Sequence, residues 1–578
     1  MRDRVRALPG YESNVLAVTA VFVGVLAGVG AVILELLLRL FGKLFLGAET
    51  AVGTDALRVL IAPVVGGLLA GPMIARGAQE AKGHGVPEVM EAVAVKGGRI
   101  RGRVAIVKTL ASALTIGSGG SAGREGPIVQ VGATLGSTAG QLLRMSESRI
   151  RLLVACGAAG GISAAFNAPL AGVFFALEII LQRFSARGFA TVVLSAVTAS
   201  VIWRSAFGNQ PVLNVPAFGL RNPVELLFYV ILGLLAAVAA VAFIRALYWT
   251  EDRFDGLRLL EDLKPALGGF LLGLVGLATL ELGHGSVAYG SGLPGINLAL
   301  GGGLVWWVLL ALFAAKLAAT SLTLGSGASG GVFAPSLFMG AMLGAAFGQG
   351  VHALFPGMTA GAGAYAMVGM AAVFAGAAHA PISSILILFE MTNDYRIILP
   401  LMLACIVATL TASVLLPDSI YTLKIRRKGV ELTEGRERHL LERTPVSRAT
   451  LPDVVTVPSP TTLERARRLM QEQATDRLLV VADGDRLVGV LRAERLADTD
   501  DRTGDDPVDD LVEDYPVVTP QESIDDALRK LAPRGLPMVP VVADQATRRV
   551  IGLVTRDSLL TAYWNALGAE REGGRHGA

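Results

Sequence analysis

Long apolar stretches with almost no charge fill the first three quarters of the chain. Four uncharged runs stand out, at residues 15–34, 226–244, 298–315 and 397–417. Each approaches the ~20 residues that a helix needs to cross the hydrocarbon core of a bilayer. The pattern therefore predicts an all-α polytopic membrane protein over residues 15–425.

The hydrophobic pattern changes after that region. Residues 426–446 are rich in charge and are expected to be a linker. In 447–566 short apolar runs follow amphipathic helical segments, and the sequence Val-Val-Ala-Asp occurs twice, at 480–483 and 541–544. This arrangement favours a soluble α/β pair, 447–500 and 510–566, followed by a polar, disordered tail at 567–578.

The apolar part contains an internal repeat of its own. Residues 117–136 align without a gap with residues 325–344, and each copy has a glycine-rich loop followed by a helix with proline near its start. Further matches lie on both sides of this segment. They pair Lys108 with Lys316, Ala168-Pro169 with Ala380-Pro381, and Glu178 with Glu390. The membrane part is thus expected to consist of two homologous halves, about 15–205 and 224–425, as in many transporter folds.

Each repeated loop places a helix N-terminus at membrane depth. Such a terminus has unpaired N–H groups and a partial positive charge, so an anion is its natural ligand. In the first copy, Gly123-Arg-Glu-Gly-Pro127, Glu125 projects where an anion would bind. Intramembrane carboxylates are costly and usually functional, which makes Glu125 a candidate gate; the alternative is an ordinary helix-start acid. The second copy, Gly331-Val-Phe-Ala-Pro335, offers the amides of Val332 and Phe333, although plain core packing would also explain it.

Composition adds a few limits. Hydrophobic residues make up 52% and charged residues 17% of the chain, and the formal net charge of +3 gives no indication of nucleic-acid binding. The two cysteines, Cys156 and Cys405, lie in apolar runs and are expected to be free thiols. Metal-ligand spacings are not evident, so no metal and no required cofactor are predicted. Arginines before the first apolar run and basic residues at 424–428 predict cytoplasmic termini, with 1–14 as the N-terminal segment.

Together these motifs resemble the CLC family of chloride channels and transporters. The resemblance covers about residues 12–425 and rests on both proline-containing loops, the run FNAPLAG at 166–172 and Tyr421 after the last apolar segment. It implies a non-enzymatic homodimer in the cell inner membrane, with inverted repeats in each subunit and chloride as the bound ion. It also implies that Glu125 is the gate. The implied anion ligands are His84, Gly126, Val332, Phe333 and Tyr421, with Arg124 and Lys108 in support.

Two positions depart from the family pattern. His84, in Gly83-His-Gly-Val-Pro87, replaces the serine that binds the anion in relatives; it could donate to an anion or be a loop histidine in water. Ile179 replaces the second glutamate of proton-coupled members, directly after Glu178. We therefore favour passive or weakly coupled chloride movement, with chloride/proton exchange as the alternative.

The soluble pair resembles tandem CBS domains, which often bind adenine nucleotides. Thr555 and Asp557 match the ribose-binding pattern, so an adenine nucleotide is a possible ligand. A purely structural, dimer-stabilising pair is the alternative for this module.

A hypothesis from another class is an intramembrane serine protease. Gly327-Ala-Ser-Gly330 resembles the serine turn of such enzymes, with Ser329 as nucleophile and His379 as base. Against it, the serine recurs as Ser121 while no histidine stands at the position matching His379, and a nucleophile needs one base within reach.

Overall fold

The structure is a computed structural model of the whole chain. It describes residues 11–47, 55–182, 184, 186–209, 213, 219–281, 287, 289–430, 441, 444–497, 503–531 and 536–573. The chain divides into two compact units, Met1–Glu431 and Leu432–Ala578. The two units are described separately below.

The first unit is helical throughout its described residues. Its first half contains α2 (Tyr11–Leu46), α3 (Ala56–Pro72), α4 (Val86–Val95), α5 (Arg103–Gly117), α6 (Glu125–Leu142), α7 (Glu147–Phe166), α8 (Pro169–Phe175), the π-helical turn η3 (Ala176–Leu181) and α9 (Ala186–Phe207). Its second half contains α10 (Glu225–Asp255), α11 (Lys264–Glu281), α12 (Leu293–Leu300), α13 (Trp306–Gly325), α14 (Phe333–Leu354), α15 (Ala362–Ala378), α16 (Pro381–Thr392), α17 (Ile398–Leu415) and α18 (Thr422–Arg427). In the described part of the chain, nine helices are long and apolar enough to cross a membrane, which makes this unit an integral multi-span membrane protein.

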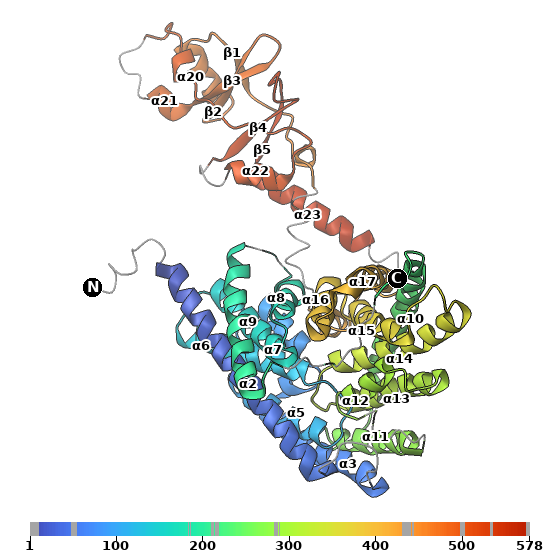
Figure 1. Cartoon of the computed structure of the whole chain (residues 1–578). Coiled ribbons are helices and arrows are strands. Elements are labelled where there is room, and N and C mark those ends of the chain that lie inside the picture. Colours follow the sequence, from blue (N-terminus) through green and yellow to red (C-terminus); the bar gives the residue numbers. More distant parts are fainter. Residues whose placement is uncertain are drawn as a thin grey trace. The chain divides into compact units, whose positions relative to one another are not determined.

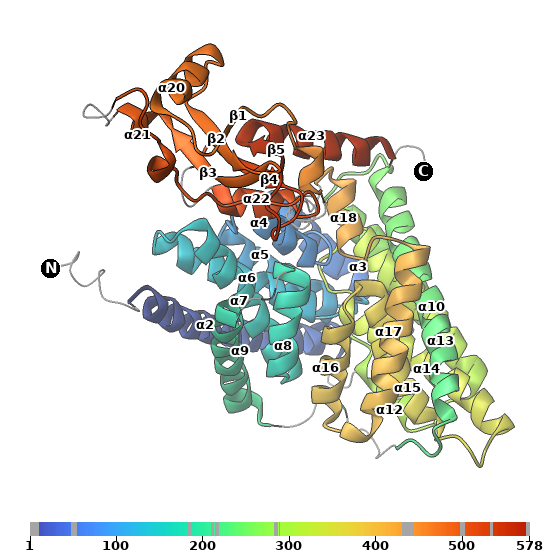
Figure 2. The same cartoon turned by 90° about the horizontal axis from the view of Figure 1, so that it is seen from above.

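The two halves lie side by side, blue to cyan and green to gold in the figures (Figures 1 and 2). Their helices pack in the same pairs: α6 on α7 as α14 on α15, and α2 on α9 as α10 on α17. Matching elements also meet each other across the halves, α3 with α11 and α8 with α16. Self-matching contacts of this kind are what a two-fold axis produces, so the repeat of the sequence is a repeat of structure.

The same reciprocity reaches individual hydrogen bonds. Glu178 accepts the N–H groups of Ile382 (3.2 Å) and Ser383 (2.7 Å) at the start of α16. In return Glu390 accepts those of Leu170 (3.1 Å) and Ala171 (2.7 Å) at the start of α8. Each carboxylate thus satisfies orphan N–H groups at the helix start of the other half.

The second unit contains two small sheets flanked by helices. Strands β1 (Thr456–Pro458), β2 (Arg477–Ala482) and β3 (Arg486–Arg492) form one sheet, and β4 (Met538–Val542) with β5 (Val550–Thr555) form the other. Strand β2 runs parallel to β1 and antiparallel to β3, and β4 runs antiparallel to β5. The helices are α20 (Leu463–Glu472), α21 (Ala493–Ala497), α22 (Ile524–Leu531) and α23 (Arg556–Gly573).

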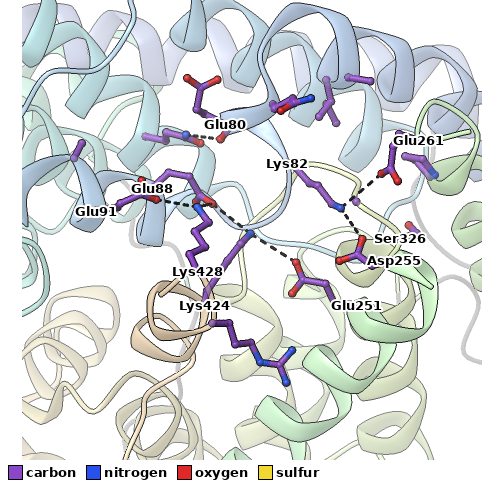
Figure 3. Close-up of a pocket in the computed structure, with 18 of the residues that line it drawn as sticks. Glu80, Lys82, Glu88, Glu91, Glu251, Asp255, Glu261, Ser326, Lys424 and Lys428 are labelled. Carbon is purple, nitrogen blue, oxygen red and sulfur yellow. Dashed lines mark hydrogen bonds and ion pairs between the residues drawn. The ribbon is translucent and has the colours of Figure 1, made fainter. Parts of the chain in front are cut away.

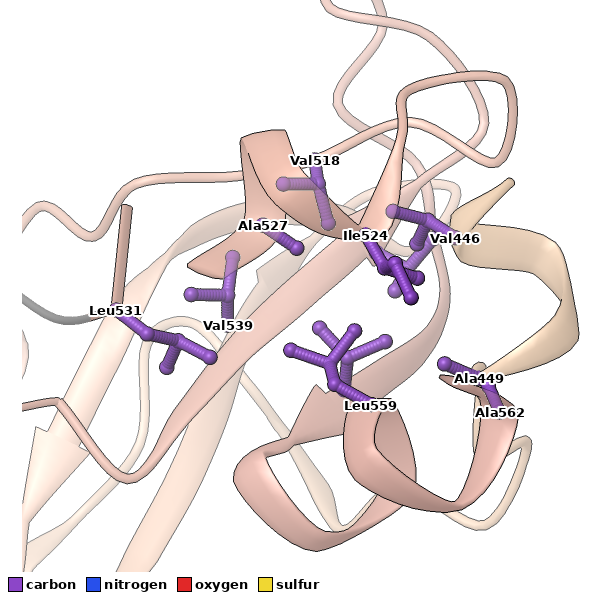
Figure 4. Close-up of a cluster of buried hydrophobic side chains, with 11 residues drawn as sticks. Val446, Ala449, Val518, Ile524, Ala527, Leu531, Val539, Leu559 and Ala562 are labelled. Atoms are coloured by element: carbon purple, nitrogen blue, oxygen red, sulfur yellow. The ribbon is translucent and has the colours of Figure 1, made fainter. Parts of the chain in front are cut away.

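Each copy of this α/β pair has its own hydrophobic core. In the second copy Ile524 and Leu531 of α22 and Leu559 of α23 lie in one buried cluster with Val539 of β4 (Figure 4). The expected disordered tail at 567–578 is wrong up to Gly573, because α23 continues to that residue; residues 574–578 lie outside the described part.

Candidate functional site

The two repeated loops meet head to head. Gly123 N–H donates to the carbonyl of Gly331 (2.8 Å), and Gly331 N–H donates to the carbonyl of Gly123 (2.7 Å). Helix α6 begins two residues after the first glycine and α14 two residues after the second. The starts of both helices, with their free N–H groups, are therefore held together at one place.

Glu125 lies at this junction. It is only 4% exposed, and its carboxylate interacts with its own backbone N–H and with that of Ala334, on the facing helix. Its Oε2 atom has no hydrogen-bond partner among the described residues. The carboxylate therefore occupies a place between two helix starts where an anion would also be stabilised.

The two loops can approach each other this closely because glycine, which has no side chain, stands at the points of contact. A Cβ on Gly123 would overlap the Glu125 carboxylate, and one on Gly126 would overlap the carbonyl oxygen of His84. A Cβ on Gly331 would lie 2.8 Å from the backbone nitrogen of Gly126. Glycine at these positions is what allows backbone to line the junction.

His84 is buried beside two tyrosines. It is 3% exposed, its Nε2 lies 3.5 Å from the Tyr248 hydroxyl, and its ring centroid lies 6.0 Å from that of Tyr421. The Nδ1 atom has no partner in the described part of the chain. The interpretation of His84 as a loop histidine in water is wrong, because the ring is enclosed. Tyr248 also fixes the neighbouring segment by donating to the Ile420 carbonyl (2.6 Å).

Lys108 is fully buried and supports the turn that carries His84. Its Nζ donates to the carbonyls of Gly83 (2.7 Å) and Ala81 (3.1 Å). Lys316, its counterpart, is also buried and donates to the carbonyl of Gly290 (2.8 Å). Both lysines therefore pair with backbone carbonyls.

Sequence reasoning missed the turn that Lys316 supports. Gly290-Ser-Gly-Leu-Pro294 is the second-half copy of the turn containing His84, and it too begins a helix, α12. In both turns the second glycine has a positive φ, 84° at Gly85 and 80° at Gly292. The alignment of Lys108 with Lys316 is the signal that could have found this turn.

The remaining predicted residues are buried around the junction. Tyr421 is 2% exposed and close enough to Glu125 for an electrostatic interaction. Val332 and Phe333 are each 2% exposed, and the Phe333 ring packs 4.6 Å from Phe166, between centroids. Arg124 forms an ion pair with Glu35 on α2 and also acts electrostatically on Glu125.

The Ser329 and His379 pair required by a protease does not form. The Ser329 hydroxyl lies 2.8 Å from that of Ser112, on α5. Its first-half copy, Ser121, is bonded in the same way to Thr320 on α13 (3.0 Å). These matched serine contacts join the halves, which accounts for the repeated serine without a nucleophile.

A charged cavity of about 940 Å³ lies next to this site (Figure 3). Tyr248 lines it, and Lys424 lies over Gly83 within an ion-pair group that includes Glu88 (3.3 Å) and Glu251 (4.0 Å). Lys428 pairs with Glu91 (2.9 Å) in the same cavity. Burial alone would lower the pKa of Lys428, but the carboxylates of Glu88 and Glu91 raise it, so this lysine stays charged.

In the soluble unit the two residues predicted to bind a nucleotide, Thr555 and Asp557, differ in their surroundings. The Thr555 hydroxyl accepts the N–H of Ser558 (3.1 Å), and Ser558 Oγ accepts the N–H of Thr555 (3.0 Å), forming a reciprocal cap of α23. Asp557 is exposed. Ser558, which sequence reasoning passed over, is thus the residue that contacts Thr555.

Paired halves, glycine loops that meet at a buried carboxylate, and a polar cavity beside them define a membrane protein built to hold anions. The sequence profile described as "Voltage gated chloride channel" matches residues 66–413, and that of the CBS domain matches 446–500 and 508–565. The chain belongs to the voltage-gated chloride channel (CLC) family and has two CBS domains.

Individual proteins agree with this assignment. A ClcB-like chloride channel protein of Ralstonia nicotianae is 40% identical over 372 residues, covering 64% of this chain and 85% of the relative. The H(+)/Cl(-) exchange transporter ClcA of Yersinia pestis is 35% identical over 368 residues, covering 63% and 76%. The crystal structure of a slow cyanobacterial Cl-/H+ antiporter superposes with a TM-score of 0.62 at 28% identity, covering 72% of this chain and 98% of that one.

Proposed function

We propose that this protein moves chloride across a membrane through the junction of α6 and α14, with Glu125 as the gate. One observation carries the proposal: the Glu125 carboxylate lies between two helix starts that are joined by the Gly123–Gly331 hydrogen bonds. A carboxylate in an anion site competes with a permeating anion. Protonation, or displacement by chloride, removes that competition and opens the pathway.

The dehydrated ion is held by donors from both halves. Backbone amides of Gly126, Val332 and Phe333 supply N–H groups, and the Tyr421 hydroxyl supplies an O–H donor. His84 adds a ring N–H through its unpartnered Nδ1. Neutral donors bind chloride weakly enough to release it again, which transport requires. The reaction involves no covalent intermediate, so the protein is a transporter or channel and not an enzyme.

Transport is passive or weakly coupled to protons. Ile179 is 4% exposed and cannot carry a proton at the position that bears a glutamate in proton-coupled members. Exchange remains the alternative, because relatives include proteins named as chloride/proton exchangers.

The assembly and its ligands follow the family. Two copies form a homodimer in the cell inner membrane, with both termini in the cytoplasm. Exposed apolar residues on α17, such as Leu399 and Val414, provide a surface for lipid or for the second copy. The CBS pair binds an adenine nucleotide through Thr555 and Asp557, or else supports the dimer.

The test is chloride efflux from phospholipid vesicles that contain the purified full-length chain. We expect rapid efflux when valinomycin supplies a potassium counter-flow, because the site holds an anion. Vesicles without protein give the background. Efflux at background level, or equal movement of sodium ions, would contradict the proposal.

A further inference from the structure

A second, smaller cavity is lined by Tyr421 but not by His84. It has a volume of about 140 Å³ and is lined by Tyr421, Glu178, Ile179 and His379, among others. At about 30 Å³ per molecule in liquid water, this volume can hold several waters. Exposed Gln182 also belongs to its wall, so the cavity reaches the surface of the unit.

His379 offers this cavity an unused nitrogen. Its Nε2 is buried and has no hydrogen-bond partner among the described residues. The residue caps the C-terminus of α15 in the left-handed conformation, with φ of 53°. A neutral imidazole with one free nitrogen can accept a proton there and release it to a neighbouring water.

Glu178 is less suited to carry the proton. Its oxygens accept the N–H groups of Ile382 and Ser383 and the Ser383 hydroxyl (2.5 Å). Both carboxylate oxygens of Glu178 are therefore engaged at the start of α16.

One carboxylate, that of Asp418, acts on the charge of His379. Asp418 interacts with it electrostatically and is itself paired with Arg426 (2.6 Å). Glu178 and Asp418 therefore lie on the two segments that flank the histidine, with Arg426 neutralising part of the second. Burial lowers the pKa of His379 and the Asp418 carboxylate offsets only part of this effect, so the imidazole is neutral between proton transfers.

We propose that His379, instead of residue 179, carries protons through this cavity to Tyr421, which couples chloride movement weakly to protons. The proposal rests on the proposed function. In each transfer His379 Nε2 takes a proton from a water on one side and returns it to a water on the other, so no electrons move. Tyr421 interacts with Glu125, which makes the gate the end of the route.

The experiment measures chloride efflux and uphill proton movement together in vesicles of the full-length protein under a chloride gradient. The variant is His379→Asn, because Asn167 occupies the matching position of the first half at φ of 54° and asparagine tolerates this conformation. We expect the proton-to-chloride ratio to fall about 10-fold, as for loss of a proton carrier. Chloride efflux should stay within about 2-fold, since the anion ligands are untouched.

Two further variants test whether a change in the proton-to-chloride ratio is specific to position 379. His352→Asn, on α14, changes a histidine outside this cavity and should leave the ratio unchanged. Ile179→Glu should raise the ratio and make it independent of position 379. If His379→Asn folds poorly, His379→Gln takes its place in the same measurement.

The contradicting results are also distinct. An unchanged ratio in both position-379 variants would overturn the assignment of His379. Wild-type proton movement no larger than in vesicles without protein would overturn the proton route, while normal chloride efflux would still support the proposed function. Loss of chloride efflux in the wild type would instead refute that function.

Discussion

The two halves have almost the same backbone and different chemistry. At equivalent helix starts the first half presents Glu125 and the second half presents Phe333. The carboxylate lies in the shared junction, whereas the ring packs against Phe166 and Phe374. The repeat therefore supplies the scaffold that aims two helix starts at one place, and the difference between its copies supplies the carboxylate that we propose as the gate.

The two halves also carry different residues at two other matching positions. His84 in the first turn corresponds to Ser291 in the second, and Asn167 corresponds to His379. The bonds that join the halves are by contrast alike, as with Ser112–Ser329 and Ser121–Thr320. Contacts that build the fold are present in both halves, whereas the residues that we propose to contact the ion or the proton differ.

The largest effect should come from breaking the junction itself. In Gly126→Ala the new methyl group would overlap the His84 carbonyl, and backbone cannot move aside easily. We expect chloride efflux to fall at least about 10-fold, since a displacement of one ångström at an ion site costs more than about 1.4 kcal/mol. Efflux from vesicles, normalised to incorporated protein, measures it.

The control for this change is Gly350→Ala. Gly350 lies in α14, and a Cβ there meets nothing within 4 Å. Efflux should stay at the wild-type level, with helix stability raised by about 0.5–1 kcal/mol. Equal loss of efflux in Gly126→Ala and Gly350→Ala would contradict a specific role for the junction of α6 and α14 in transport.

A smaller effect on transport is expected when the turn at residues 83–87 is given the residue found in the matching turn at 290–294. His84→Ser places the second-half residue in the first turn, and it replaces an imidazole N–H by a shorter hydroxyl donor. We expect the chloride-to-nitrate permeability ratio to change by about 3–10-fold, the value of one altered hydrogen bond. His352→Ser is the control, and an identical ratio in His84→Ser would remove His84 from the ion's ligands.

The smallest effect concerns the reciprocal caps. Glu178→Gln and Glu390→Gln remove the charge but keep an oxygen, so each should destabilise the membrane unit by about 1 kcal/mol. Glu178→Gln should cost more, because the Ser383 hydroxyl also donates to it. Thermal unfolding in detergent checks this order; the reverse order would mean that the extra bond contributes nothing.

Much of this arrangement could be predicted from local sequence. The repeated glycine loops, the helix starts and Glu125 follow from spacing alone, because glycine and proline fix backbone geometry over a few residues. Tyr248 and Glu35 could not be found in this way. Their partners, His84 and Arg124, are far away in the chain, and only the folded structure brings such pairs together.

The soluble unit shows the same limit on a smaller scale. The sequence pattern singled out Thr555 and Asp557, but it gave no indication that Ser558 bonds to Thr555 in the turn after β5 while Asp557 is exposed. Which side chain faces inward at a helix start depends on the rotation of that helix, and a shift of one residue changes it by about 100°.

The most direct test of the account is the pH dependence of chloride efflux with and without the Glu125 carboxylate. In the wild type, chloride efflux should be about 5-fold or more faster at pH 5 than at pH 8, because protonation of the Glu125 carboxylate at low pH frees the anion site. In Glu125→Gln efflux should be high and nearly the same at both pH values. A Glu125→Gln variant that keeps the wild-type pH dependence would contradict the claim that this carboxylate is the gate.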